Sequence, residues 1–265
     1  MINIKILIII FIISILFFLI NNYLYSVENF VNEELNNLEV DIIIARYNED
    51  LMWTLEYPFN QFKYIVYNKG NNENFEKKYV SKIIKLPNVG KCDHTYLYHI
   101  IENYDKLSDI TVFFPGSIDL KHKKKIAVKI LKEIYLRKNA IFISLNESDI
   151  QKLHYKFKLD YYKTRHLLNR SDDSTDYMLK KSNIRPFGLW FENMFGNLKI
   201  NCLIYYGIFS IHKNDIIQHP KSRYEKIIKE LSDHPNPEVG HYLERSWCAV
   251  FHPMNKTEII KYNKI

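Results

Sequence analysis

Polar side chains follow several apolar runs of the sequence, at the points where each run stops. The run at residues 40–45 is followed by Arg46, and the run at residues 64–67 is followed by Asn68 and Lys69. The carboxyl ends of parallel strands meet at one edge of a sheet, and ligands bind beyond that edge. The sequence therefore predicts one binding edge. The candidate residues at its turns are Arg46, Asn48, Glu49, Asp50, Asn68, Lys69, Asn88, Gly90, His94 and Asp119.

A second group of reactive side chains lies near the end of the chain, on a predicted helix at about residues 238–251. At the 3.6-residue period, His241, Glu244 and Arg245 fall on one face together with Cys248, opposite an apolar face. Two interpretations stay open. The polar face is either solvated and held by an ion pair, or it is turned into a cleft where a carboxylate or imidazole can act as a general base.

Alternating strands and helices must position these groups. Residues 83–86, about 93–104 and 110–114 form a strand–helix–strand unit, with Pro and Gly where each strand ends. This alternation predicts an α/β fold with a mostly parallel, doubly wound sheet. The other predicted strands are 40–45, 64–67, 140–145 and 203–211, and the other predicted helices are 51–57, 124–136, 224–231 and about 238–251.

The N-terminus has the features of a membrane anchor. Residues 6–20 are apolar except for Ser14, and the uncharged stretch continues to Tyr25, which is long enough to cross a bilayer. No small-residue cleavage site follows it. The sequence predicts a transmembrane signal anchor at residues 1–25, a polar stem at 26–39 and a single α/β domain at 40–265.

Charge and cysteine content bear on location and partners. Lys5 precedes the apolar run, whereas Glu28, Glu33 and Glu34 follow it, so the positive-inside rule predicts a lumenal or extracellular domain. The net charge of +7 suits anionic partners. Nucleic acid is not expected as a partner, since no RNP-like or zinc-finger pattern occurs. The three cysteines leave at least one thiol unpaired, and a Cys202–Cys248 disulfide stays open.

Six ordered blocks resemble a known family. They are ARYNED (45–50), YNKG (67–70), LPNVGKCDHTYLYHIIENYDKL (86–107), TVFFPGS (111–117), RPFGLWFENMFG (185–196) and GHYLERSW (240–247). Together they resemble an uncharacterised domain-of-unknown-function family of fungi, protists and large DNA viruses. That family looks like a distant relative of the GT-A glycosyltransferases, whose α/β sheet binds a nucleotide sugar.

The GT-A resemblance implies roles for the candidate residues. It implies nucleotide binding at the turn that begins with Arg46, and a Mn²⁺ or Mg²⁺ ion held by an Asp-x-Asp after a central strand. The matching segment here is Pro115-Gly116-Ser117-Ile118-Asp119, in which Asp119 is the single carboxylate, so the metal clamp is incomplete. Without the metal, the charge of a departing diphosphate would be offset by cationic side chains, with Arg46, Lys69, Lys91 and Arg245 as the candidates.

Two functional hypotheses follow. The first is a membrane-anchored glycosyltransferase-like enzyme that moves a sugar from a nucleotide-sugar donor to a glycan or protein hydroxyl, with Glu244 or His241 as general base and Arg245 beside them. The second is a non-catalytic carbohydrate- or protein-binding module on the same fold.

Overall fold

The computed structural model describes residues 13–19, 38–145, 150–162, 166 and 178–262 of the 265 residues. The chain divides into two compact units, Met1–Glu39 and Val40–Ile265. In the first unit, residues 13–19 are helical and carry exposed apolar side chains such as Phe17 and Phe18. The remainder of the predicted anchor, and the predicted stem up to residue 37, lie outside the described residues.

Within the parts of the chain that the structure describes, no helix has the length and apolar character needed to cross a membrane.

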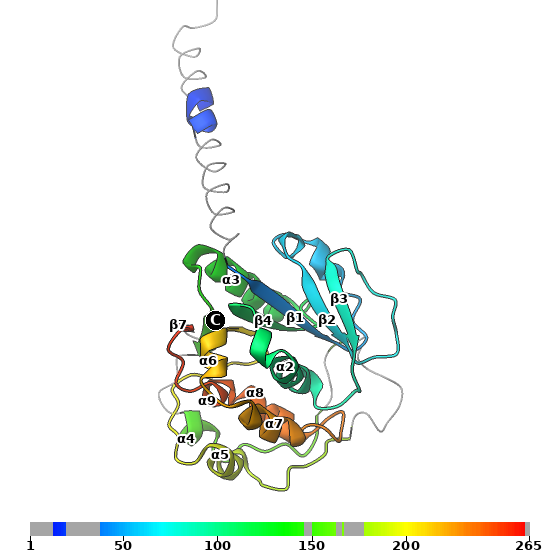
Figure 1. The fold of residues 1–265 in the computed structure, drawn as a ribbon, viewed down its shortest axis with the longest axis vertical. Coiled ribbons are helices and arrows are strands. Elements are labelled where there is room, and N and C mark those ends of the chain that lie inside the picture. The colour runs from blue at the N-terminus through cyan, green and yellow to red at the C-terminus, as the bar shows by residue number, and fades with distance from the viewer. Residues whose placement is uncertain (1–12, 20–37, 146–149, 163–165, 167–177, 263–265) are drawn as a thin grey trace, which may run out of the picture. The chain divides into compact units, whose positions relative to one another are not determined.

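The second unit is built on a five-stranded sheet in the order β3-β2-β1-β4-β6 (Figure 1). Neighbouring strands are parallel except for β6, which runs antiparallel to β4. In the register of the sheet, Ile44 lies opposite both Val66 and Phe114. The prediction of an α/β fold with a mostly parallel sheet is therefore confirmed. The strands are β1 (Val40–Arg46), β2 (Tyr64–Asn68), β3 (Val80–Lys85), β4 (Ile110–Pro115) and β6 (Phe209–His212).

Both faces of the central strands are covered, which explains why β1 and β4 are continuous apolar runs. Successive side chains of a strand point to opposite faces. Phe113 therefore packs against Tyr96 of helix α2 (Lys91–Glu102), at 4.7 Å between ring centroids. Phe114 points the other way and meets Trp53 of the 3₁₀-helix η1 (Met52–Leu55), at 6.2 Å.

A second, two-stranded sheet pairs β5 (Ile141–Leu145) with β7 (Glu258–Tyr262) in parallel. The predicted strand at 140–145 therefore exists but belongs to this smaller sheet. Ser210 of β6 bridges the gap between the sheets, because its hydroxyl accepts from the amide of Ile141 at 2.7 Å and donates to the carbonyl of Ile141 at 2.8 Å. The helix α3 (Lys121–Arg137) packs against β5 and β6.

Two predicted elements near the C-terminus are wrong in their extent. The strand expected at 203–211 begins only at Phe209, because Tyr206 and Gly207 have left-handed φ angles of 70° and 63°. The single helix expected at 238–251 breaks at Ser246, with φ −113° and ψ 2°.

The remaining elements are α4 (Ile150–His154), α5 (Phe187–Phe195), α6 (Lys213–Ile217), α7 (Lys221–Lys229), α8 (Glu238–Glu244), α9 (Trp247–Val250), η2 (Phe59–Gln61) and η3 (Tyr104–Lys106).

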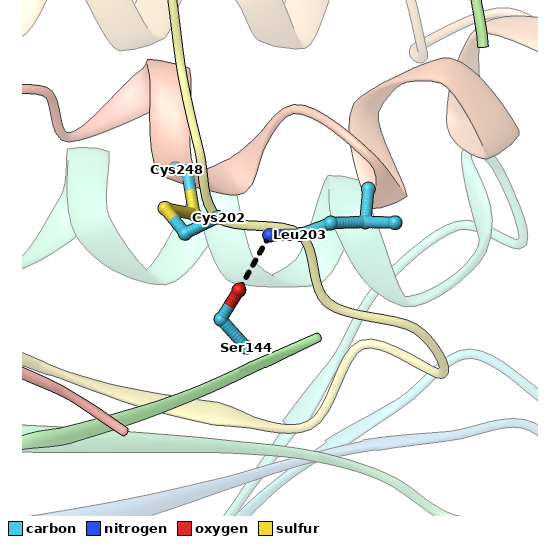
Figure 2. Close-up of a disulfide and its surroundings, with 4 residues drawn as sticks. All are labelled: Ser144, Cys202, Leu203 and Cys248. Carbon is cyan, nitrogen blue, oxygen red and sulfur yellow. Dashed lines mark hydrogen bonds between the residues drawn. A yellow bond between two sulfur atoms is a disulfide. The ribbon is translucent and has the colours of Figure 1, made fainter. Parts of the chain in front are cut away.

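A buried disulfide joins Cys202 to Cys248, so the segment before β6 is tied to α9 (Figure 2). The helix pattern predicted that Cys248 shares the polar face of Glu244. That prediction is wrong, because Cys248 is 1% exposed and bonded to Cys202. Beside the bond, the amide of Leu203 donates to the hydroxyl of Ser144 at 2.8 Å. Cys92 is the free thiol.

Candidate functional site

A cavity of about 580 Å³ lies where β1, β2 and β4 end. The chain runs from β1 to β2 to β3 in one direction and then crosses through α2 to β4, on the other side of β1. The carboxyl ends of β1 and β4 therefore form the switch point of the sheet, which is where open α/β sheets bind ligands. The lining residues used below are Arg46, Glu49, Lys69, Asn88, Lys91, Cys92, Asp93, Ser117, Lys123, Phe157, Tyr162, His166, Tyr205, Tyr206, His241, Glu244 and Arg245.

Arg46 ties together the turns that form the floor of this cavity. It is 0% exposed, and its guanidinium donates to the carbonyl of Glu49 at 2.7 Å and to Asn68 Oδ1 at 2.7 Å. Its planar group also lies over the ring of Phe75, at 4.1 Å. Burial lowers the pKa of Arg46 from its usual value, while the neighbouring carboxylate of Glu49 raises it. The residue therefore holds the end of β1 against the end of β2.

Three lysine ammonium groups face the cavity. Lys69 Nζ donates to the carbonyls of Val89 and Lys91, while Lys91 Nζ lies 4.1 Å from the centre of the Tyr162 ring. Lys123 Nζ donates to Ser117 Oγ at 2.7 Å. These partners are carbonyls, a ring and a hydroxyl, so they neutralise little of the positive charge.

Burial changes the proton affinity of all three amines. It lowers the pKa of Lys69 to about 7 and the pKa of Lys91 to about 8. The pKa of Lys123 is also lowered, mainly by burial, although several nearby acidic groups raise it. Desolvation disfavours the charged form of an amine, and a bound anion reverses that effect. The cluster is therefore suited to a negatively charged ligand.

Asp93 is a buried acid at the start of α2. It is 3% exposed, and its Oδ1 accepts from the indole nitrogen of Trp247 at 2.9 Å. Burial and then the charge of Glu244 raise the pKa of Asp93 to about 7. A carboxyl group that gains and loses its proton near neutrality can act in proton transfer.

The C-terminal part of α8 supplies the wall that faces the lysines. Glu244 Oε1 accepts from the amide of Tyr206, and its Oε2 lies 3.6 Å from Arg245 Nη1. Arg245 Nη1 also donates to the carbonyl of His241 at 2.8 Å, and its guanidinium lies over Phe157 at 3.9 Å. The polar face predicted for this helix therefore lines the cavity.

His241 stays neutral in this wall. Its ring packs on Tyr162 at 4.3 Å between centroids, and burial lowers the pKa of His241 to about 3, followed by the charges of Lys91 and Arg245. Within the described residues, His241 Nε2 has no hydrogen-bond partner. A neutral imidazole can hydrogen-bond a ligand as donor or acceptor.

Eight of the sequence-predicted residues meet in this cavity, and six lie outside its lining. Those in the lining are Arg46, Glu49, Lys69, Asn88, Lys91, His241, Glu244 and Arg245. Those outside it are Asn48, Asp50, Asn68, Gly90, His94 and Asp119.

Four of the outlying residues support the structure around the cavity. Asn68 accepts from Arg46, and Asp50 Oδ1 accepts from the amide of Met52 at 3.0 Å at the start of η1. Gly90 has a left-handed φ of 57° at the start of α2, and a Cβ there would lie 2.6 Å from that of Leu231. His94 stacks on Tyr98, at 6.3 Å between ring centroids.

The side chains after β4 do not fit a Mn²⁺ or Mg²⁺ ion. Both carboxylate oxygens of Asp119 lie beside His166 Nε2, at 3.0 and 3.1 Å, and Ser117 Oγ accepts from the ammonium of Lys123. Hard divalent cations need several oxygen ligands and are repelled by a neighbouring ammonium. In the portions of the chain that the structure describes, no cluster of three His, Cys, Asp or Glu side chains could hold a metal ion.

Sequence reasoning missed several lining residues, among them Asp93, Lys123 and His166. Asp93 and Lys123 lie in the first turns of α2 and α3, where the apolar pattern marks the helices but does not show which polar residue turns inward. The position of Lys123 could have been inferred, because it directly follows the turn after β4.

The comparisons with known proteins give a family and no activity. The family described as "Protein of unknown function (DUF3431)" matches residues 42–263. None of the curated proteins compared with the chain matches it.

Proposed function

The chain belongs to the DUF3431 family of proteins of unknown function, and from its cavity we propose that it is a membrane-anchored, glycosyltransferase-like enzyme. It binds a nucleotide sugar and transfers the sugar to a hydroxyl group of a glycan or protein. The relationship to the GT-A glycosyltransferases is part of this proposal and is supported by the fold class, a mostly parallel α/β sheet.

One observation carries the proposal: a cationic cavity lies at the switch point of the sheet. Five cationic side chains of the described lining face three carboxylates, and the cations come from the ends of β1 and β2 and from α2, α3 and the end of α8. A diphosphate between a nucleoside and a sugar carries negative charge that such a wall can neutralise. A cavity of about 580 Å³ is of the size that small-molecule ligands occupy.

The proposal gives complementary roles to the two walls of the cavity. The diphosphate lies against the amines of Lys69, Lys91 and Lys123, and the acceptor hydroxyl lies on the side of Glu244. As a bond forms between the acceptor oxygen and the anomeric carbon, the bond from that carbon to the diphosphate oxygen breaks. Glu244 takes the proton of the hydroxyl, and the departing diphosphate keeps the electron pair.

His241 and Arg245 orient the acceptor side. The neutral ring of His241 offers a hydrogen-bonding nitrogen, and Arg245 fixes the end of α8 through the carbonyl of His241 and the ring of Phe157. Arg245 Nη1 also lies 3.6 Å from Glu244 Oε2, so the two side chains are held together at the end of α8.

The proposal places the catalytic unit in the secretory lumen or outside the cell, held by the anchor at residues 1–25. The Cys202–Cys248 disulfide supports this location, since such bonds persist in oxidising compartments.

Donor turnover tests the proposal. The full-length chain in detergent is incubated with UDP- and GDP-sugars, with water alone or with added glycans as the acceptor of the sugar. Release of the nucleoside diphosphate is measured against the heat-unfolded chain. We expect release from at least one donor. If a nucleotide sugar binds but no nucleoside diphosphate is released from it with any acceptor, the non-catalytic binding module is the better description. The side chains after β4 favour that second candidate, because only Asp119 remains of the metal clamp and it is paired with His166.

A further inference from the structure

We propose that the ammonium group of Lys123, together with those of Lys91 and Lys69, replaces a divalent cation, so that the cavity binds a nucleoside diphosphate without metal. This inference rests on the proposed function and adds how the charge of the leaving group is neutralised.

Lys123 lies where the metal clamp was expected. It is in the first turn of α3, directly after the turn that follows β4, and its Nζ is 2.7 Å from Ser117 Oγ. If Asp119 is taken as the second carboxylate of the expected Asp-x-Asp, the first position is Ser117. A fixed positive charge therefore already lies against the first of these positions.

Asp119, at the second position of the expected Asp-x-Asp, already has a partner. Asp119 has both oxygens within 3.1 Å of His166 Nε2, and its side chain is 46% exposed whereas that of His166 is 6% exposed. The imidazole is thus the buried partner that faces the cavity, and the carboxylate lies behind it. A metal ion bound by Asp119 would have to break the contact between Asp119 and His166, and it would lie near the ammonium of Lys123, whose pKa burial lowers and the charge of Asp119 raises.

The other two amines complete a cationic wall. Lys69 is anchored by the carbonyls of Val89 and Lys91, and Lys91 lies over Tyr162. Both line the same cavity as Lys123. Three ammonium groups converging on one buried space repel one another and are stabilised by an anion placed among them. An ordinary solvated lysine face would leave these side chains exposed, but burial lowers the pKa of each.

The test is calorimetric titration of the full-length chain in detergent with UDP, GDP and inorganic pyrophosphate. Each titration is done with EDTA and again with Mn²⁺ or Mg²⁺. Pyrophosphate reports on the diphosphate subsite whichever base the enzyme prefers. We expect the dissociation constant in EDTA to lie within about threefold of the value with metal, because the site supplies its own cations.

A lysine variant with a matched control locates the effect. Lys123→Met removes the charge at similar length, and we expect diphosphate affinity in EDTA to fall at least tenfold, whereas Lys123→Arg retains most of it. The control is Lys132→Met, an exposed lysine of the same helix, which should bind as the original chain does. The comparison of the dissociation constants in EDTA and with metal needs no variant. It therefore tests whether binding requires a metal ion even if Lys123→Met fails to fold.

Two results would overturn the inference, and they have different consequences for the proposed function. Binding that appears only with Mn²⁺ or Mg²⁺ contradicts the lysine mechanism and leaves nucleotide recognition standing. No binding of any probe under either condition removes the proposed function as well.

Discussion

Glu244 is the proposed general base. One of its oxygens accepts from the amide of Tyr206, and the other lies 3.6 Å from Arg245 in the wall of the cavity. Glu244→Gln keeps the acceptor for that amide but cannot take a proton. We expect sugar transfer to fall by about 10²–10⁴-fold, the usual contribution of a general base, with donor affinity little changed. The measurement is steady-state transfer together with donor titration.

The matched control is Glu225→Gln, an exposed glutamate of α7 that should leave the rate unchanged. A Glu244→Gln enzyme that keeps more than a tenth of the original rate would contradict the assignment. Asp93 would then be the next candidate, because it lines the same cavity and its pKa is raised to about 7, by burial and then by Glu244.

Lys69 and Lys91 also give a prediction about protons. Burial lowers their pKa values to about 7 and about 8, so at pH 8 both amines are partly neutral in the free protein. A bound diphosphate favours the charged forms and raises both pKa values. Binding at pH 8 should therefore take up about one proton, whereas binding at pH 6, where both amines are already charged, should take up almost none from them.

Calorimetric titrations in several buffers measure this proton uptake. The observed binding enthalpy, plotted against the ionisation enthalpy of the buffer, should have a positive slope. Lys91→Arg keeps the charge but cannot release its proton at pH 8, so its slope should be smaller. A slope at pH 8 that Lys91→Arg leaves unchanged would show that the Lys91 amine does not meet the ligand. The other ionisable groups near these two amines are Cys92, Asp93, Lys123 and Glu244.

The sequence predicted part of the site because strand ends are readable from apolar runs. Arg46, Lys69 and Asn88 follow such runs and line the cavity. The sequence did not separate residues that face the cavity from those that support it, since neighbours in one turn point different ways. Asn68, for example, is turned toward Arg46 instead of the ligand space.

At the scale of elements, the turn after β4 is packed too closely to accept a side chain at Gly116. A Cβ there would lie 2.7 Å from Cδ of the buried Glu49. Glu49 Oε2 accepts from the amide of Tyr47 at 2.7 Å, so this carboxylate cannot move aside without losing that bond. The Gly116 carbonyl also accepts from the indole of Trp53 at 2.8 Å. We expect Gly116→Ala to destabilise the protein by roughly 1–3 kcal/mol, measured by denaturant unfolding. Gly240→Ala is the control, because its Cβ would meet nothing closer than 3.8 Å. Equal loss in both variants would contradict this account of the turn.

The disulfide connects α9 to the segment that carries Tyr205 and Tyr206 into the cavity wall. It closes a loop with a sequence separation of 46. Replacing both cysteines (Cys202→Ala with Cys248→Ala) should cost roughly 2–4 kcal/mol and lower the Tm by about 5–10 °C. Reductant should lower the Tm of the original chain toward that of the double variant and leave the double variant unchanged. An oxidised chain with the same Tm as the double variant would show that the bond does not stabilise the fold.

Element types were largely predictable, and their ends were less so. Strands β1, β2 and β4 and helices α2 and α3 occur where apolar periodicity placed them. The errors lie where tertiary contacts override the pattern. The predicted strand at 203–211 is shortened by the left-handed residues Tyr206 and Gly207, beside a disulfide whose formation the sequence left open.

For the molecule as a whole, strand order decides where the site lies, and a single sequence does not determine that order. The crossing from β3 through α2 to β4 places β4 beside β1 and thereby brings the ends of β1, β2 and β4 around one cavity. Only this arrangement lets Arg46, near the start of the domain, share a space with Glu244 near its end.

The most direct test is the crystal structure of the chain with a bound nucleoside diphosphate, UDP or GDP, grown in EDTA. The account predicts that the diphosphate lies at the ends of β1 and β4, with its oxygens within hydrogen-bonding distance of the amines of Lys91 and Lys123. Density for the nucleotide at another surface, with this cavity left without it, would contradict the account.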